Sequence, residues 1–185
     1  MSSPYAMELQ DELAGACEDE GLRLYALVDG AHDPGLVPRL RAAEDEAVCL
    51  YAGAPSELEA VGPWLVDLGD GGGALTTALL EELWGQGCVV PLLSAASLEE
   101  LRKHFRGFLL VAREGGGKEL YFRFYDPRIL RVYLGTATPE ELATVFGPVK
   151  AFVLEQRDPA RALRCERDAA GALERAPLEL AGAEA

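Results

Sequence analysis

The 185-residue chain is 49% hydrophobic and has a formal net charge of −14. This composition excludes a wholly disordered chain, and no apolar run reaches the roughly 18 residues of a membrane helix, so membrane insertion is not expected. The charge is uneven, with −16 on residues 1–100 and +2 on residues 101–185. An acidic first part disfavours nucleic acid as a partner, because phosphates require clustered Lys and Arg. It suits solubility or a basic protein partner.

The cysteines and the first residues bear on metal binding and location. The four cysteines are far apart in sequence and form no CxxC pair, so neither a zinc site nor a redox motif is expected. Residues 1–15 contain acids and lack the basic start and apolar core of a secretory signal. We therefore expect a cytoplasmic protein with free thiols and with no metal or cofactor.

The first half of the chain predicts alternating helices and strands. An acidic helix over residues 7–20 precedes Gly21, a typical C-cap, and an apolar strand follows over residues 22–28. Asp33 and Pro34 have the pattern of an N-cap and a first helical residue, so a helix is expected through Arg41. The next patterns predict strands over 47–51, 63–68 and 88–93, one helical turn over 56–59, and an amphipathic helix over 75–84.

The second half predicts further helices around a hairpin. Ser97 and Glu100 form a capping box for a helix over residues 98–106. A Gly-rich loop between two apolar runs then predicts a β-hairpin of residues 108–113 with 119–126. Two helices over 127–133 and 139–146 and a last strand over 149–155 follow.

These elements predict an α/β fold. We expect a mixed β-sheet with flanking helices, in a single compact domain over residues 1–155. Residues 156–185 are rich in Arg, Ala and Glu with scattered leucines, and are expected to be a C-terminal tail. The tail is interpreted either as a weak helix followed by a mobile end or as a segment that orders on a partner.

The most distinctive stretch is YFRFYDPR, residues 121–128. Alternation in a strand would place Tyr121, Arg123 and Tyr125 on one face and the two phenylalanines on the other. Asp126-Pro127 would end that strand, because Pro has no N–H for a ladder, and a helix would begin at Arg128. Two interpretations of Arg123 stay open: a structural ion pair with Asp126 or another acid, and a recognition surface with its plane stacked on a tyrosine.

Few residues suggest catalysis. Asp29, His32 and Asp33 follow a strand end, a frequent position for ligand or metal residues in α/β sheets, although plain turn residues are commoner there. Residues 115–118, GGGK, lack the spacing of a phosphate-binding loop, and no serine lies in a GxSxG elbow. We therefore expect a protein that is not an enzyme. The alternative is a small cytoplasmic enzyme or ligand-binding domain that uses Asp29, His32 and Arg123.

Several short motifs in a fixed order resemble a known family. They are YALVDGA at residues 25–31, LYAG at 50–53 with GPWLV at 62–66, FRFYDPRIL at 122–130, and FGPV at 146–149. In this order they resemble the domain of unknown function that forms type VI secretion effector chaperones, also called adaptors. The resemblance spans about residues 22–155, and RFYDPR is its most specific part.

The resemblance implies a function and a set of residues. It implies a non-enzymatic protein of Gram-negative bacteria that binds a toxic effector protein in the cytoplasm and helps to load it onto the spike protein of the secretion machine. The residues that it marks for partner binding or for the family motif are Asp29, Arg123, Tyr125, Asp126 and Arg128. We expect this chain to lack a long C-terminal extension, and in this respect it departs from the resemblance.

Overall fold

The computed structural model describes residues 3–43, 46–51, 53, 55–111 and 120–181. Its centre is a seven-stranded sheet with the strand order β2-β3-β1-β4-β7-β8-β9. The strands are β1 (Arg23–Asp29), β2 (Ala47–Cys49), β3 (Pro63–Asp67), β4 (Val89–Ser94), β7 (Val149–Glu155), β8 (Arg161–Arg167) and β9 (Leu173–Glu179). Two short strands, β5 (Leu110–Val111) and β6 (Leu120–Tyr121), pair with each other outside this sheet.

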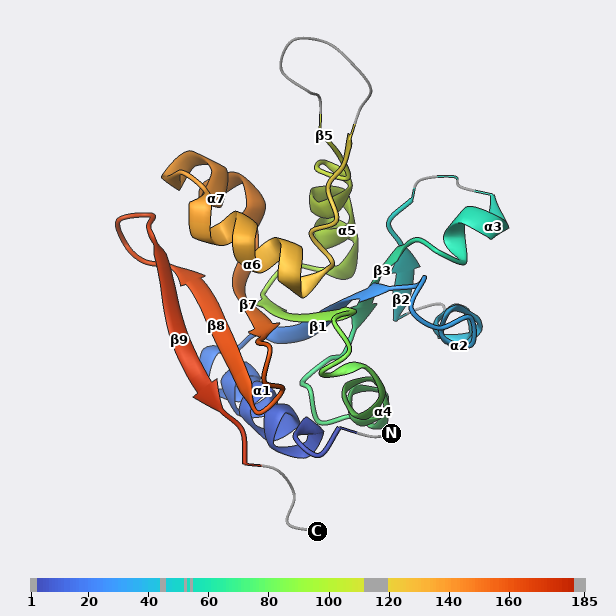
Figure 1. Cartoon of the computed structure of the whole chain (residues 1–185), viewed down its shortest axis with the longest axis horizontal. Helices are drawn as coiled ribbons and strands as arrows, with labels where there is room; N and C mark the ends of the chain where they lie inside the picture. The colour runs from blue at the N-terminus through green and yellow to red at the C-terminus, as the bar shows by residue number, and fades with distance from the viewer. Residues whose placement is uncertain (1–2, 44–45, 52, 54, 112–119, 182–185) are drawn as a thin grey trace.

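Helices cover both faces of the sheet (Figure 1). The helices α1 (Ala6–Glu20), α2 (Leu36–Ala42) and α4 (Ala74–Leu83) contribute to one core, and α5 (Leu98–Arg106), α6 (Pro127–Thr136) and α7 (Pro139–Phe146) contribute to the other. A single turn, α3 (Ser56–Glu59), lies beyond the β2 edge. In the described part of the chain, no helix has both the length and the apolar character that crossing a bilayer requires.

The alternation of side chains along β1 explains the two cores. Leu24, Ala26 and Val28 pack with the first group of helices, and Tyr25 and Leu27 pack with the second. All of these residues are fully buried, because β1 lies between β3 and β4 and both of its faces are covered. This explains why the strand is almost continuously apolar.

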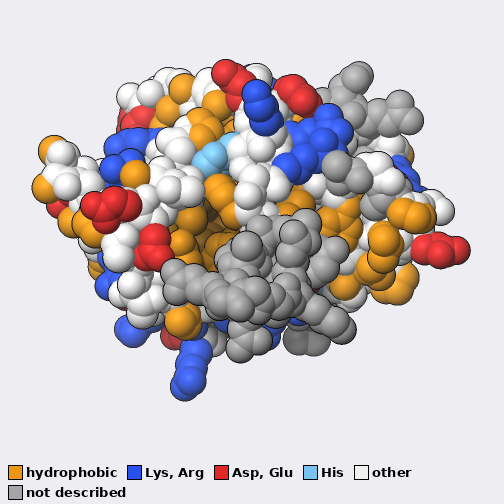
Figure 2. Space-filling model, turned by 90° about the horizontal axis from the view of Figure 1, so that it is seen from above, with side chains coloured by type: hydrophobic (Ala, Val, Ile, Leu, Met, Phe, Trp, Pro, Cys, Tyr) orange, Lys and Arg blue, Asp and Glu red, His pale blue; other side chains and the backbone are white. Residues whose placement is uncertain are grey.

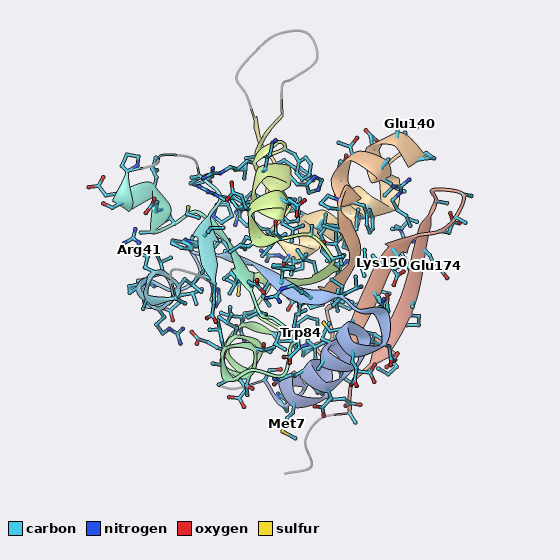
Figure 3. All side chains as sticks on the ribbon, turned by 180° about the vertical axis from the view of Figure 1, so that it is seen from behind. Met7, Arg41, Trp84, Glu140, Lys150 and Glu174 are labelled. Carbon is cyan, nitrogen blue, oxygen red and sulfur yellow. The ribbon has the colours of Figure 1, made fainter. Side chains whose placement is uncertain are left out.

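The molecular surface differs from face to face. Seen from above, basic side chains lie in several separate places on the surface, and hydrophobic side chains reach the surface on both flanks (Figure 2). From behind, Met7 and Glu174 point away from the body, whereas Trp84 lies within it (Figure 3). The Trp84 indole N–H donates to the Pro159 carbonyl at 2.9 Å, which ties the end of α4 to the turn before β8.

Several predictions that depend on local signals are confirmed. The Ser97 hydroxyl and the Glu100 side chain form the expected capping box of α5, and Thr138 with Glu141 forms a second one at α7. Gly21 ends α1 in the left-handed conformation with φ 66°. The α/β class with helices flanking a sheet is confirmed as well.

A mixed sheet was expected, but this prediction is wrong. Every pair of neighbouring strands in the seven-stranded sheet is antiparallel. The chain passes from β1 to the edge strand β2 and then to β3, which lies between them. β3 and β4 flank β1, and both run opposite to it. The start of α2 also differs from the prediction. Asp33 accepts a hydrogen bond from the Gly35 N–H at 2.7 Å in a turn, and the helix begins two residues later than Pro34, at Leu36.

The prediction of a tail over residues 156–185 is wrong, and so is the domain boundary at 155. Residues 161–167 and 173–179 form β8 and β9, and β8 pairs with β7 from Ala151↔Glu166 to Glu155↔Ala162. The sequence of β8 shows no clear alternation of large apolar and polar residues, because its buried positions are the small residues Ala162 and Cys165. The turn between the strands left a better signal: Asp168 accepts from the Ala170 and Ala172 N–H groups at 2.8 Å, and Gly171 has φ 83°.

The predicted strand over residues 119–126 is also wrong beyond Tyr121. The Phe122 N–H still donates to the Leu109 carbonyl, but the chain then turns, and the Asp126 N–H donates to the Arg123 carbonyl at 3.0 Å. Because of this turn, the adjacent residues Phe124 and Tyr125 are both buried, which alternation in a strand would not allow. Residues 112–119, the predicted loop of the hairpin, lie outside the described residues.

Candidate functional site

Most of the residues singled out from the sequence meet at one end of the sheet. β4 runs opposite to both β1 and β7, so β1 and β7 end at the same edge. Asp29 is the last residue of β1 and Glu155 is the last residue of β7. The N-terminus of α6 brings Asp126 and Arg128 to this edge, because the Arg128 guanidinium lies near both Glu155 and Gly87.

Arg123 and Asp29 form an ion pair across 94 positions of sequence. The Arg123 Nη2 donates to Asp29 Oδ2 at 2.7 Å, and the other carboxylate oxygen of Asp29 accepts from the Ala31 N–H at 3.0 Å. The Asp29 side chain is 10% exposed and that of Arg123 is 47% exposed. The guanidinium carbon of Arg123 also lies 5.6 Å from the centre of the Tyr125 ring. Both interpretations of Arg123 therefore have a geometric basis: it forms an ion pair and contacts a tyrosine.

Asp126 has two structural tasks at the start of α6. Its Oδ1 accepts from the backbone N–H of Arg128 at 3.0 Å, which makes it the N-cap. Its two oxygens also accept from Arg128 Nε and Nη2 at 2.9 and 2.7 Å, a bidentate pair. Burial by itself would raise the pKa of Asp126, but the hydrogen bonds from Arg128 outweigh it and hold that pKa below its usual value. Asp126 is therefore a buried, charged cap.

Glu155 belongs to the same charged cluster and was not predicted. One carboxylate oxygen of Glu155 accepts from the Gly85 N–H at 2.7 Å, and its backbone carbonyl accepts from Arg131 Nη1 at 3.0 Å. Burial raises the pKa of Glu155. The turn that wraps it requires Gly87, which has φ 73° and whose added Cβ would lie 3.4 Å from the Arg128 guanidinium. An acid directly after four consecutive apolar strand positions was the available signal.

A hollow of about 430 Å³ opens beside this cluster. Its basic lining residues are Arg128, Arg131 and Arg157. It is also lined by the turn at residues 85–87 and by Glu155 and Gln156. Val132 of α6 also lines it. Because Arg128 is 66% exposed, its charge reaches solvent even though its partner is buried. The hollow can accept an acidic group from outside, next to an exposed apolar side chain.

The groups at this end of the sheet do not form a recognised catalytic arrangement. His32 is exposed, and it contacts Asp29 through the backbone, where the His32 N–H donates to the Asp29 carbonyl at 3.1 Å. Cys88 lies next to Asp29, but burial raises the pKa of its thiol to about 12, far from a reactive thiolate. Among the described residues, no three His, Cys, Asp or Glu side chains are grouped so as to hold a metal ion.

Comparison with known proteins identifies the family. No curated protein and no solved structure matches the chain. The family profile described as "Domain of unknown function (DUF4123)" matches residues 24–144, well over half of the chain. The matched range contains Asp29 and the whole of residues 121–128, and it ends before Glu155. The chain therefore belongs to the family of the domain of unknown function DUF4123.

Proposed function

We propose that this protein is a cytoplasmic, non-enzymatic adaptor, or chaperone, that binds a type VI secretion effector and helps to load it onto the spike protein. The order of motifs along the sequence supports the type of function. The geometry adds that the most specific motif is engaged internally: Asp126 caps α6 and pairs with Arg128, and Arg123 pairs with Asp29. Residues so engaged position a helix and are poorly available for chemistry on a substrate.

The observation that carries the proposal is the outer surface of the helix that this motif positions. Ile129 and Val132 of α6 are 37% and 66% exposed, and a spacing of three residues puts them on one side of the helix. Arg128 and Arg131 flank them, and the basic hollow adjoins Val132. Exposed aliphatic side chains next to arginines are typical of protein-binding surfaces. We call Ile129, Val132 and the residues of this hollow the α6 surface, and propose it as a partner-binding face.

The alternative small enzyme or ligand-binding domain has less support. It would use Asp29, His32 and Arg123, but the Asp29 carboxylate is already engaged by Arg123 and by the Ala31 N–H. His32 contributes only a backbone contact there. We propose binding without catalysis, and without a metal or cofactor.

Co-purification with the products of the neighbouring genes tests this function. The tagged protein would be co-expressed with the candidate toxin and with the candidate spike protein, and an adaptor is expected to retain both. If neither protein is retained by the wild-type chain, the adaptor function is wrong.

A pair of matched variants tests the surface. Val132→Asp and Met7→Asp each place a charge at a side chain that is 66% exposed, the first on the α6 surface and the second on α1, on the other face of the sheet. We expect both variants to keep the wild-type melting temperature, and only Val132→Asp to lose a partner. Retention of both partners by Val132→Asp would exclude the α6 surface.

A further inference from the structure

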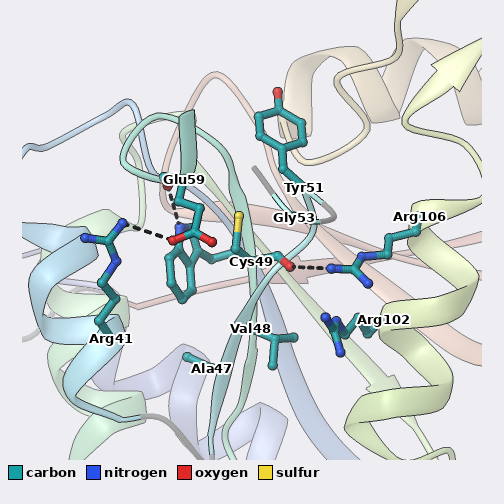
Figure 4. A pocket seen from close by; sticks show the side chains of 10 residues that line it. Arg41, Ala47, Val48, Cys49, Tyr51, Gly53, Glu59, Arg102 and Arg106 are labelled. Carbon is teal, nitrogen blue, oxygen red and sulfur yellow. Dashed lines mark hydrogen bonds and ion pairs between the residues drawn. The ribbon is translucent and has the colours of Figure 1, made fainter. Parts of the chain in front are cut away.

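The sheet ends at β2, and a hollow of about 390 Å³ follows this edge strand (Figure 4). Ala47, Val48 and Cys49 of β2 line it. Arg41 of α2 stands on one side of the strand, and Arg102 and Arg106 of α5 stand on the other. We call this hollow the β2 trough.

The main chain of β2 has hydrogen-bonding groups on its outer side. The Asp67 N–H donates to the Glu46 carbonyl and the Leu50 N–H donates to the Pro63 carbonyl, so the alternation of an antiparallel pair directs Val48 toward β3. The N–H and C=O groups of Ala47 and Cys49 then point away from β3, toward the open edge of the sheet. The Ala47 N–H donates to the Ala43 carbonyl, and the Cys49 carbonyl accepts from Arg106 Nη2 at 3.4 Å.

Among the described residues, the outward groups of β2 that have no hydrogen-bond partner are the Ala47 carbonyl and the Cys49 N–H. These two groups belong to the residues on either side of Val48. In a parallel pair of strands, a single residue of one strand forms its two hydrogen bonds with two such groups of the other strand. Such a residue would donate its N–H to the Ala47 carbonyl and accept from the Cys49 N–H. An antiparallel neighbour would instead need both groups of Ala47 or both groups of Cys49.

The trough is short of negative charge. Arg41 pairs with Glu59 and Arg102 pairs with Glu99, but no carboxylate of the described residues lies within ion-pair distance of Arg106. The guanidinium of Arg106 binds backbone carbonyls instead, with its Nε 3.0 Å from the Leu50 oxygen. Burial, and then the neighbouring charge of Arg102, lower the pKa of Arg106.

Arg102 has a hydrogen-bond donor that is not satisfied. Its Nε–H is buried and has no hydrogen-bond acceptor among the described residues. A chain with a net charge of −14 therefore has a local excess of arginine along one sheet edge.

We propose that the β2 trough binds an extended acidic segment of a partner protein as an additional, parallel strand of the sheet. Side chains of an added strand alternate between the two sides of the sheet. Those on one side would reach Arg41, and those on the other would reach Arg102 and Arg106, so the segment needs acids at adjacent positions. This inference deepens the proposed adaptor function and rests on it, because it specifies how a partner is recognised.

A fluorescent peptide of about eight residues tests the proposal, since a strand of that length spans the trough. It carries two adjacent glutamates between Thr and Val residues, and its binding is followed by fluorescence anisotropy. We expect saturable binding that weakens about tenfold when both glutamates become glutamine. Methylation of single backbone nitrogens should weaken binding most at one position, the residue whose N–H donates to the Ala47 carbonyl.

Variants of the chain locate the peptide. Arg102→Ala and Arg41→Ala are each expected to weaken binding about fivefold, which is the loss of one charge-assisted contact. Their matched controls are Lys103→Ala on α5 and Arg39→Ala on α2, which remove the same charge from the same helices outside the trough. The controls are expected to bind as the wild type does, and melting temperatures check the fold of all four variants.

Cys49 provides an independent readout. It is the one cysteine of the four that is not buried, so alkylation of the folded protein reports on the trough. Burial raises the pKa of its thiol, and the reaction is therefore run at alkaline pH. Bound peptide is expected to slow the alkylation of Cys49.

The outcomes against the proposal are distinct. Absence of peptide binding, or equal losses in Lys103→Ala and Arg102→Ala, would overturn the trough as the site. Equal tolerance of methylation at every backbone nitrogen would overturn strand addition. The titration contains neither effector nor spike protein, so its failure is separable from a failure of co-purification, which would overturn the adaptor function itself.

Discussion

At the scale of single residues, the motif at 121–128 mainly stabilises the fold through ion pairs and a helix cap. Three acids that lie far apart in sequence, Asp29, Asp126 and Glu155, are buried at one end of the sheet. Arginines at positions 123 and 128 pair with the first two, and Arg131 binds the backbone of the third. Each buried carboxylate has a hydrogen-bond partner, which offsets the cost of its burial. A role of Arg123 or Arg128 in partner binding remains a prediction.

Asp126 is the residue whose replacement should affect stability most clearly. We expect Asp126→Ala to lower the free energy of unfolding by about 2 kcal/mol, because a helix cap and a buried ion pair are lost together. Asp126→Asn should lose about half as much, since asparagine still caps a helix. Urea unfolding at neutral pH measures both. The control, Asp158→Asn in an exposed turn, should change the value by less than about 0.5 kcal/mol.

The pH dependence of this effect has a definite sign. The pKa of Asp126 is lower in the folded protein than its ordinary value of 3.8, so its stabilising charge is fully present above that value. It is lost as the pH falls through the folded pKa. The difference between the wild type and Asp126→Asn should therefore be constant near neutral pH and should shrink below 3.8. A constant difference down to the most acidic pH would contradict a charged Asp126.

At the scale of elements, signals within a few residues were sufficient for the helices. The capping box of α5 and the Gly21 C-cap each involve residues that are neighbours in sequence, and each was correctly predicted. β8 and β9 have no comparable local signal. Their position depends on pairing with β7, and their buried positions hold small residues.

The C-terminal hairpin should be essential for the fold. Deletion of residues 160–185 would expose the edge of β7 and remove Ala162, Cys165 and Leu180 from the core. We expect a loss of more than about 10 °C in melting temperature, or aggregation, because an unpaired hydrophobic edge promotes association. Deletion of residues 182–185 alone is the control and should change the melting temperature by no more than about 2 °C. A truncated protein with wild-type melting would contradict the hairpin's role.

At the scale of the whole molecule, the folded distribution of charge differs from the distribution along the sequence. The first hundred residues have a net charge of −16, yet one of their three bases, Arg41, joins Arg102 and Arg106 in the β2 trough. The chain thus has a basic site on an acidic molecule. An acidic segment is attracted at short range and repelled by the molecule as a whole.

This arrangement predicts an unusual dependence on salt. At about 10 mM salt the screening length is near 30 Å and the net charge opposes binding of the acidic peptide, whereas at about 150 mM it is near 8 Å and mainly the arginines of the trough act. At about 1 M both effects are screened. The affinity should therefore be highest at the intermediate concentration. Anisotropy titrations at the three concentrations measure this, and a steady fall from the lowest to the highest would contradict the balance.

The sequence by itself determined the α/β class, most helices with their caps, and the strands that are long and apolar, because all of these depend on periodicity or on contacts between near neighbours. It also marked Asp29, Arg123, Tyr125, Asp126 and Arg128 as a group. Only the tertiary structure decided that Arg123 pairs with Asp29, that Glu155 completes the cluster, and that residues 156–179 extend the sheet. These features depend on strand order and on which ends of the strands meet, and no local pattern of side chains encodes either.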